Sequence, residues 1–150
     1  MKLYITTESG QVFKDGVGAS GIDLSSLPYN VNTVQWNGTS GFMDFTDGSQ
    51  TETLSGIDRF LGIIPLWEIA YKKEHKPAPY YVWDYKSNDW KVDTNAKKQY
   101  DIDQQVSTYK ISLNDTDWYY ARKAETGQDI PLDVVSQRKT ARDYIVANTL

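Results

Sequence analysis

Two prolines interrupt the chain near its middle, in the stretch Lys76-Pro-Ala-Pro. A proline has no amide proton to donate, and it pushes the residue before it toward extended backbone. A helix or a central strand therefore cannot continue through this stretch. We expect a domain boundary here, with an N-terminal lobe over residues 1–76 and separate structure in the part that follows.

The first third of the chain has the alternation and the turn signals of short antiparallel strands. Val34 and Trp36 alternate with polar neighbours, as in a strand that is buried on one face. Asn37-Gly38 and Asp47-Gly48 supply tight turns between such stretches. The pattern predicts a small antiparallel β-meander from Lys2 to about Leu54.

A helix is expected between this meander and the prolines. Ser55 and Asp58 have the spacing of a capping box, in which two side chains satisfy free amides of the first turn. Pro65 must kink or restart the helix, because it lacks a donor and clashes with the preceding turn. The apolar residues at helical spacing are Ile57, Phe60, Leu61, Ile64, Leu66, Ile69 and Ala70. The lobe over residues 1–76 is therefore predicted to be β-rich with a kinked helix.

The stretch from Tyr80 to Asp93 is rich in aromatic residues and has turn residues, Ser87-Asn88-Asp89, near its middle. It predicts an aromatic β-hairpin over residues 77–93. An isolated two-stranded hairpin is barely stable in water. Its aromatic surface must therefore cover either the N-terminal meander or another chain.

Residues 94–150 are predicted to be helical. A thin apolar stripe runs through a first helix from Thr94 to Tyr109, and residues 110–117 are expected to form an extended connector and cap. Two further helices should pair as a hairpin, because Gly127 suits a helix end and Pro131 suits a helix start. The whole chain thus predicts an α+β fold with a meander and a helix, an aromatic hairpin and a C-terminal helical hairpin.

Composition argues against several classes of function. The net charge is -4, so no broad basic face for nucleic acid is expected. With no cysteine and one histidine, His75, we expect no metal site, and we expect no cofactor. No apolar run approaches the roughly 20 residues that span a membrane. Asp84 beside Trp83 and Trp90 could describe a glycosidase subsite, but a solvated strand edge is the favoured interpretation. We therefore expect no enzyme.

The segment from Asp115 to Ile145 resembles the C-terminal domain of bacteriophage tail fibre assembly chaperones. The shared order is Asp-Trp, a short charged helix, a Gly-x-x-x-Pro turn and a helix with a Gln-Arg…Arg pattern. The matching residues are Asp117, Trp118, Arg122, Gly127, Pro131, Arg138 and Arg142. The stretch from Pro77 to Trp90 is similar to a Tyr/Trp segment of the same group. The stretch from Asn32 to Phe45 is similar to a strand pair found in many small phage tail proteins.

The resemblance implies a small phage protein that binds a trimeric tail fibre, or a neighbouring tail or baseplate protein, and assists its assembly. It implies a location in the host cytoplasm during assembly, or in the virion tail, and it brings no catalytic residues. The chain departs from the commoner form in a less alanine-rich helix over residues 94–109 and a better developed meander. Two alternatives stay open: a permanent structural adaptor of the tail or baseplate, and a glycan-binding module whose exposed aromatic side chains stack on sugars.

Tryptophan, tyrosine and arginine side chains usually carry the binding energy of a protein interface. The candidate partner-binding residues are therefore Trp83, Trp90, Trp118, Tyr119, Arg122, Arg138 and Arg142. The competing expectation for Trp118 is a place in the core of the helical hairpin, where Arg142 could stack on it. For Arg138 and Arg142 the competing expectation is a solvated helix face.

Overall fold

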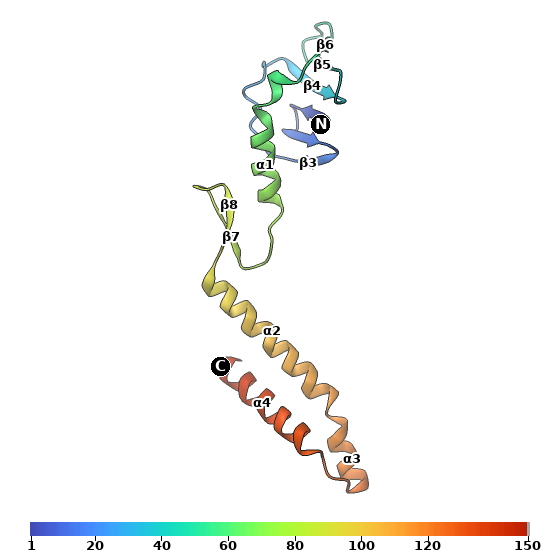
Figure 1. Ribbon diagram of the computed structural model, residues 1–150, viewed down its shortest axis with the longest axis vertical. Coiled ribbons are helices and arrows are strands. Elements are labelled where there is room, and N and C mark those ends of the chain that lie inside the picture. The colour runs from blue at the N-terminus through green and yellow to red at the C-terminus, as the bar shows by residue number, and fades with distance from the viewer. Residues whose placement is uncertain (150) are drawn as a thin grey trace. The chain divides into compact units, whose positions relative to one another are not determined.

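The computed structural model describes residues 1–149 and confirms the predicted α+β fold (Figure 1). The chain divides into two compact units. The first, here the sheet unit, comprises Met1–Ala78 and Val82–Lys91, and the second, the helical unit, comprises Pro79–Tyr81 and the residues from Val92 onward. The division thus falls beside the proline pair, but most of the aromatic hairpin belongs to the sheet unit.

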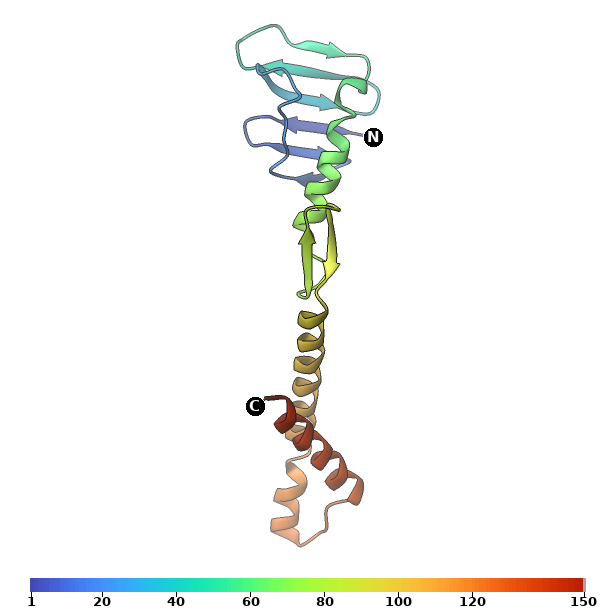
Figure 2. The same ribbon diagram turned by 90° about the vertical axis from the view of Figure 1, so that its left-hand side faces the viewer.

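The sheet unit is built on one antiparallel sheet of six strands in the order β3-β2-β1-β4-β5-β6 (Figure 2). The central pair, β1 and β4, brings together strands that are not consecutive in the chain, with Ile5 opposite Val34. The predicted turns at Gly38 and Gly48 join neighbouring strands, and both glycines have a positive φ, 112° and 76°. The strands are β1 (Leu3–Thr6), β2 (Gln11–Lys14), β3 (Val17–Ala19), β4 (Val31–Trp36), β5 (Gly41–Phe45) and β6 (Glu52–Leu54).

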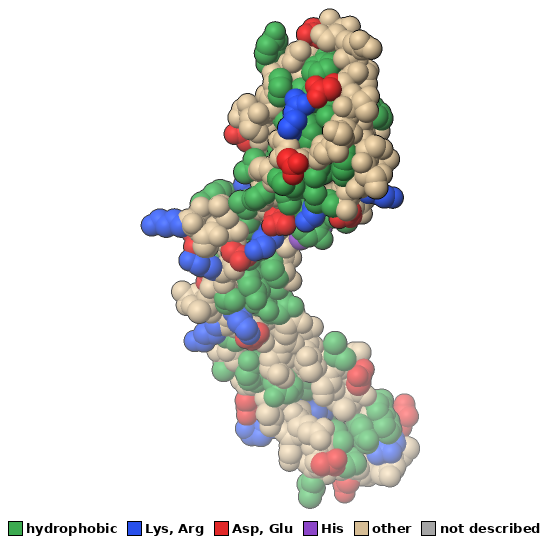
Figure 3. All heavy atoms as spheres, turned by 45° about the horizontal axis from the view of Figure 1, so that its top comes forward, with side chains coloured by type: hydrophobic (Ala, Val, Ile, Leu, Met, Phe, Trp, Pro, Cys, Tyr) green, Lys and Arg blue, Asp and Glu red, His purple; other side chains and the backbone are tan. Residues whose placement is uncertain are grey.

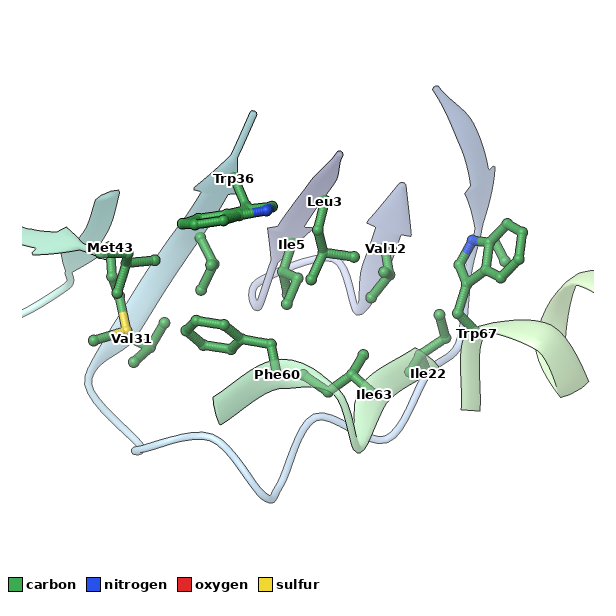
Figure 4. Packing of buried hydrophobic residues seen from close by; sticks show 13 residues of the cluster. Leu3, Ile5, Val12, Ile22, Val31, Trp36, Met43, Phe60, Ile63 and Trp67 are labelled. Carbon is green, nitrogen blue, oxygen red and sulfur yellow. The ribbon is translucent and has the colours of Figure 1, made fainter. Parts of the chain in front are cut away.

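One face of the sheet packs against a 3₁₀ turn, η1 (Asp58–Phe60), and the helix α1 (Ile63–Glu74) (Figure 4). Alternate strand residues point into this core, except at a register irregularity between Val31 and Thr33 in β4, and Phe60 and Ile63 belong to the same core. The indole Nε1 of Trp67 donates a hydrogen bond of 3.2 Å to the carbonyl of Val17 on the edge strand β3. The core residues include Leu3, Ile5, Val12, Val31, Val34, Trp36 and Met43.

The predicted start of this helix at Ser55 is wrong. No side chain caps η1, and α1 begins at Ile63 with Pro65 in its first turn. Proline is tolerated there because the amides of the first turn have no partner within the helix. Pro65 therefore restarts the helix, which was one of its two predicted effects. The burial of Phe60 against the sheet outweighs the local signal for a continuous helix from Ser55.

The aromatic hairpin is present as β7 (Tyr81–Asp84) and β8 (Asp89–Val92). The rings of Trp83 and Trp90 meet edge to face, with 5.3 Å between their centroids. The indole Nε1 of Trp90 donates a hydrogen bond of 2.6 Å to the carbonyl of Lys72, in the last turn of α1. The hairpin thus covers the end of α1, which was neither of the two surfaces considered from the sequence.

The helical unit contains α2 (Thr94–Asp115), α3 (Trp118–Thr126) and α4 (Leu132–Thr149). The side chain of Asp93 caps α2 by accepting hydrogen bonds from the amides of Asn95 and Ala96. Gly127, with a φ of 76°, ends α3 as predicted. The extended connector expected over residues 110–117 is wrong, because α2 continues as a helix to Asp115.

The helical hairpin is formed by α2 and α4, and the expected pairing of the last two helices with each other is wrong. Ile102, Val106, Tyr109 and Leu113 follow one another at intervals of four, three and four residues along α2. On α4, the same spacing relates Val134, Arg138, Ala141 and Ile145. Such spacing places each set on one face of its helix, so the two seams can pack along their length.

Candidate partner-binding site

Helix α3 starts with three consecutive aromatic residues and yet buries none of its own residues. The rings of Trp118 and Tyr119 are stacked, with centroids 3.9 Å apart and planes at 28°. The guanidinium carbon of Arg122 lies 4.7 Å from the Trp118 ring centroid and 5.1 Å from that of Tyr119. These three side chains form what we call the α3 cluster. They are one, three and four residues apart, which places them on neighbouring positions of the helix surface.

The α3 cluster combines exposed aromatic surface with a positive charge. Trp118 is 50% exposed, so the expected position in a helical core is wrong. Arg122 is half-buried, and its Nε is enclosed without a hydrogen-bond partner. Among residues 1–149, no carboxylate lies within ion-pair distance of Arg122. The cluster therefore offers an arginine that is oriented by aromatic rings and not neutralised within the described chain.

Arg138, in contrast, holds the helical unit together. It is 8% exposed, and its Nη1 donates hydrogen bonds of 2.6 Å to the carbonyl of Leu113 and to the hydroxyl of Thr116. Its Nη2 forms an ion pair of 2.7 Å with Asp117, and its guanidinium lies 4.8 Å from the ring of Tyr120. Arg138 thus joins α4 to the end of α2 and the start of α3. Arg138 is therefore neither a residue of a solvated helix face nor a residue that is free to contact a partner.

Arg142 is exposed on α4 and, within residues 1–149, makes no ion pair and no contact with an aromatic ring. The expected stack of Arg142 on Trp118 is wrong, because α4 packs on α2 and Arg122 occupies that ring. Of the seven candidate residues, the helical unit therefore brings three together, Trp118, Tyr119 and Arg122, and all three lie on the short helix α3.

The two hairpin tryptophans, Trp83 and Trp90, form a separate pair in the sheet unit. Both are half-buried, and the polar tip of Trp90 is already satisfied by the Lys72 carbonyl. The Lys76 ammonium lies 5.9 Å from the Trp90 ring centroid. This arrangement fastens the hairpin to α1. It leaves less free aromatic surface than the sequence suggested, apart from Tyr85, which is 74% exposed.

Asp84, the carboxylate considered for a glycosidase subsite, is engaged by its own hairpin turn. Its side chain interacts with Lys91, accepts a hydrogen bond of 3.0 Å from the amide of Lys86 and another of 3.0 Å from the hydroxyl of Ser87. These donors, led by the Lys91 side chain, lower the pKa of Asp84 to about 2. A carboxyl with this pKa stays ionised near neutral pH, so Asp84 is not suited to donate a proton in acid catalysis.

Sequence reasoning missed a second aromatic surface, on the open face of the six-stranded sheet. Strand pairing places six residues in one row across β3, β2, β1, β4, β5 and β6: Gly18, Phe13, Tyr4, Gln35, Phe42 and Thr53. Tyr4 and Phe42 are each 37% exposed. The ring of Phe13 lies over Gly18, where an added Cβ would come within 2.7 Å of it. The alternation of these residues with core residues was the signal that could have revealed the row.

We call these residues the open-face row, and all of them except Gly18 line a shallow hollow of about 520 Å³. The polar groups around the hollow are mostly neutral side chains, those of Gln35, Asn37, Ser40 and Thr53, with Lys2 as the charged exception. Figure 3 shows apolar side chains reaching the surface in several patches, with charged side chains scattered between them. The hollow thus combines aromatic rings with uncharged hydrogen-bonding groups.

Within residues 1–149, no group of His, Cys, Asp or Glu side chains is arranged to hold a metal ion. None of the helices described is both long and apolar enough to span a bilayer.

Comparison of the chain with protein-family models, with curated proteins and with solved structures gives no significant match. The resemblance to phage tail fibre assembly chaperones therefore stays a prediction, and any function has to be argued from that resemblance and from the geometry of the chain itself.

Proposed function

We propose that this chain is a phage tail protein that binds the tail fibre and assists its assembly, with the α3 cluster as the contact surface. The observation that carries the proposal is the position of Trp118, Tyr119 and Arg122 on a helix that buries none of its residues. Side chains of these three types dominate the binding energy of protein interfaces. The same residues lie in the segment that resembles the fibre assembly chaperones.

The small core of the helical unit supports binding to a partner. Its buried residues among those described are Val106, Val134, Arg138 and Ala141. Helices gain most of their stability in proteins from packing an apolar face, so a unit with so few buried side chains gains little from its own core. Apolar side chains stay exposed on its helices: Ile111, Leu132, Val135 and Val146 are 59%, 83%, 39% and 58% exposed. A partner that covers such side chains would add to the stability of the unit.

The contact surface is testable with matched variants in the phage. Trp118→Ala and Arg122→Ala should each reduce the amount of chain that co-purifies with fibres from an infected-cell lysate. Arg142→Ala is the control, because it removes the same charge from an exposed position without an aromatic neighbour. The helix content of each purified variant, from circular dichroism, shows whether the fold is kept. An equal loss of association for Arg122→Ala and Arg142→Ala would refute the α3 cluster as the contact surface.

Quantitative mass spectrometry of purified particles, with the cell lysate as the control, separates an assembly chaperone from a structural adaptor. A fixed integer ratio of this chain to the fibre protein would identify a structural or retained subunit of the tail. Abundance in the lysate together with absence from particles would identify a chaperone that leaves after assembly. Absence of any association with fibres or tails in either sample would contradict both.

The open-face row favours glycan binding as a second candidate function. Tyr4, Phe13 and Phe42 supply aromatic surface that can stack on the apolar face of a sugar, and Gln35 and Thr53 supply neutral hydrogen-bonding groups beside it. A glycan array with the full chain tests this function. Binding should be lost in Tyr4→Ala and in Phe42→Ala and kept in Tyr85→Ala, which removes an exposed ring elsewhere in the sheet unit. No bound glycan, or equal losses in all three variants, would exclude the row as a glycan site.

A further inference from the structure

We infer that Arg122 is a receptor for a carboxylate group of the protein partner, held ready by the rings of Trp118 and Tyr119. The inference rests on the proposed function, since it assigns the chemistry that the partner presents to the α3 cluster. The group that the partner presents is an Asp or Glu side chain, or a chain-terminal carboxylate, flanked by an apolar side chain.

The rings of Trp118 and Tyr119 orient the Arg122 guanidinium. A free arginine side chain samples many rotamers and loses that freedom when it binds an anion. Here the guanidinium already lies 4.7 Å and 5.1 Å from two ring centroids, and its Nε is enclosed by the chain. Arginine is suited to such stacking because its guanidinium is planar and delocalised. Part of the ordering that binding requires is therefore present before a ligand arrives.

The Arg122 guanidinium keeps donors that are available to a ligand. Nη1 and Nη2, unlike Nε, are not fully enclosed, and neither makes a hydrogen bond within the described residues. Two parallel N–H donors match the two oxygens of a carboxylate, which is the geometry of the strong bidentate arginine pairs.

Arg122 differs from the other three arginines of the chain. Arg59 pairs with Glu52, and Arg138 pairs with Asp117. Arg142 is exposed and lies over no ring within residues 1–149. Arg122 is thus the arginine of the described chain that is both stacked and free of a carboxylate. An unoccupied receptor would have these two properties.

The surroundings of Arg122 determine which kind of anion it suits. The neighbouring cation, Lys123, is already paired with Asp129 at 2.9 Å. A nucleic acid is recognised by several basic groups that follow its phosphates, and the chain as a whole has a net charge of -4. One isolated guanidinium beside exposed aromatic surface suits one carboxylate next to an apolar side chain. The exposed part of the Trp118 ring would take that apolar side chain.

The test uses the full chain, labelled with ¹⁵N, and nuclear magnetic resonance of the arginine side-chain and Trp118 indole N–H groups. The probes are the capped dipeptide acetyl-Leu-Glu-amide, its neutral counterpart acetyl-Leu-Gln-amide, and inorganic phosphate. The glutamate peptide should shift the Arg122 and Trp118 signals and saturate at a concentration at least about tenfold lower than at Arg142, the control in the same spectrum. The glutamine peptide should leave Arg122 unchanged.

Two results would overturn the inference directly. Equal responses of Arg122 and Arg142 to the glutamate peptide would show that the rings do not create a receptor. Saturation by phosphate at a lower concentration than by the glutamate peptide would assign the site to phosphorylated or nucleic-acid partners instead.

Two variants distinguish the effects of the paired guanidinium donors and of the aromatic rings from the effect of the positive charge alone. Arg122→Lys keeps the positive charge but removes the paired donors, and Trp118→Leu keeps an apolar side chain but removes the ring. Each should weaken binding of the glutamate peptide by about tenfold, with the helix content unchanged. If Arg122→Lys disturbs the fold, Trp118→Leu still decides the matter. Unchanged peptide binding in the correctly folded variants would refute a receptor built from these groups.

The outcome is distinguishable from that of the proposed function. If the glutamate peptide binds at Arg122 but the chain does not associate with fibres, the receptor stands and the fibre is not its partner. If the chain associates with fibres but the peptide does not bind at Arg122, the proposed function stands and the carboxylate receptor is wrong.

Discussion

Replacing Arg138 by alanine should destabilise the helical unit more than any other single arginine change. Arg138 is the one charged side chain that is buried among residues 1–149. Its guanidinium connects the Leu113 carbonyl, the Thr116 hydroxyl and the Asp117 carboxylate. These groups lie at the end of α2 and the start of α3, and Arg138 approaches them from α4. Its removal therefore loosens three elements at once.

The size of the effect follows from these contacts. The two part-buried hydrogen bonds from Nη1 should together contribute about 2 kcal/mol, at about 1 kcal/mol each. The ion pair adds about 0.5 kcal/mol at most, because the Asp117 side chain is 65% exposed and solvent screens the pair. Contact with the ring of Tyr120 adds about 0.5–1 kcal/mol. Arg138→Ala should therefore lower the free energy of unfolding of the helical unit by about 3 kcal/mol.

Hydrogen exchange at the amides of α2 is the suitable assay, because the chain has two units and a single global transition would mix them. The amides of Val106 and Tyr109 lie on the seam that faces α4, so they report on the α2–α4 pairing. Arg142→Ala is the control and should change their protection by less than about 0.5 kcal/mol. A result for Arg138→Ala that is no larger than this control would refute the anchoring role of Arg138.

Three further predictions concern the sheet unit. Gly41→Ala should cost at least about 2 kcal/mol in a thermal unfolding experiment, because the added Cβ would overlap a backbone carbonyl of the neighbouring strand. Asp84 should stabilise the fold at pH values above its ordinary pKa of 3.8, and this contribution should be lost as the pH falls toward about 2. Lys91→Gln should raise the pKa of Asp84, which can be measured from the resonance of its carboxyl carbon. Trp90→Phe should cost about 1 kcal/mol, because it removes the hydrogen bond to the Lys72 carbonyl while keeping an aromatic ring.

Each of these predictions has a matched control. Gly62→Ala has open space around the added Cβ and an ordinary helical φ of -64°, so it should leave the thermal midpoint nearly unchanged. Asp84→Asn should reduce the acid-dependent loss below pH 3.8, because other carboxylates such as Asp47 also have a lowered pKa, and an unchanged acid profile would contradict the assignment to Asp84. Trp83→Phe removes an indole N–H that makes no hydrogen bond within residues 1–149, so a cost equal to that of Trp90→Phe would contradict the role of the Lys72 contact.

Local signals in the sequence identified most of the elements. The turn at Gly48, the end of α3 at Gly127 and the break at Pro77 and Pro79 were all readable, because each depends on the backbone freedom of a few consecutive residues. The same kind of signal failed at Ser55. The capping-box spacing was present there, but packing of Phe60 against the sheet decided where the helix begins.

The candidate site was recognised only in part, for a related reason. The sequence identified Trp118, Tyr119 and Arg122 as residues of the right type, and their spacing already places them close together on a helix. It did not distinguish Arg122 from Arg138, since both are arginines on helices with aromatic residues nearby in the chain. The burial of Arg138 depends on which face of α4 meets α2, whereas Arg122 lies half-buried on α3.

The sequence by itself determined the α+β class, the order of the elements and the residue types available for binding. Alternation, helical spacing and the conformations of glycine and proline act over a few residues, and these are visible in the chain. Only the tertiary structure decided that α4 pairs with α2, and that Tyr4, Phe13 and Phe42 form one row across the sheet. Both depend on contacts between segments far apart in the chain, where many alternative pairings satisfy the same local pattern and total burial selects among them.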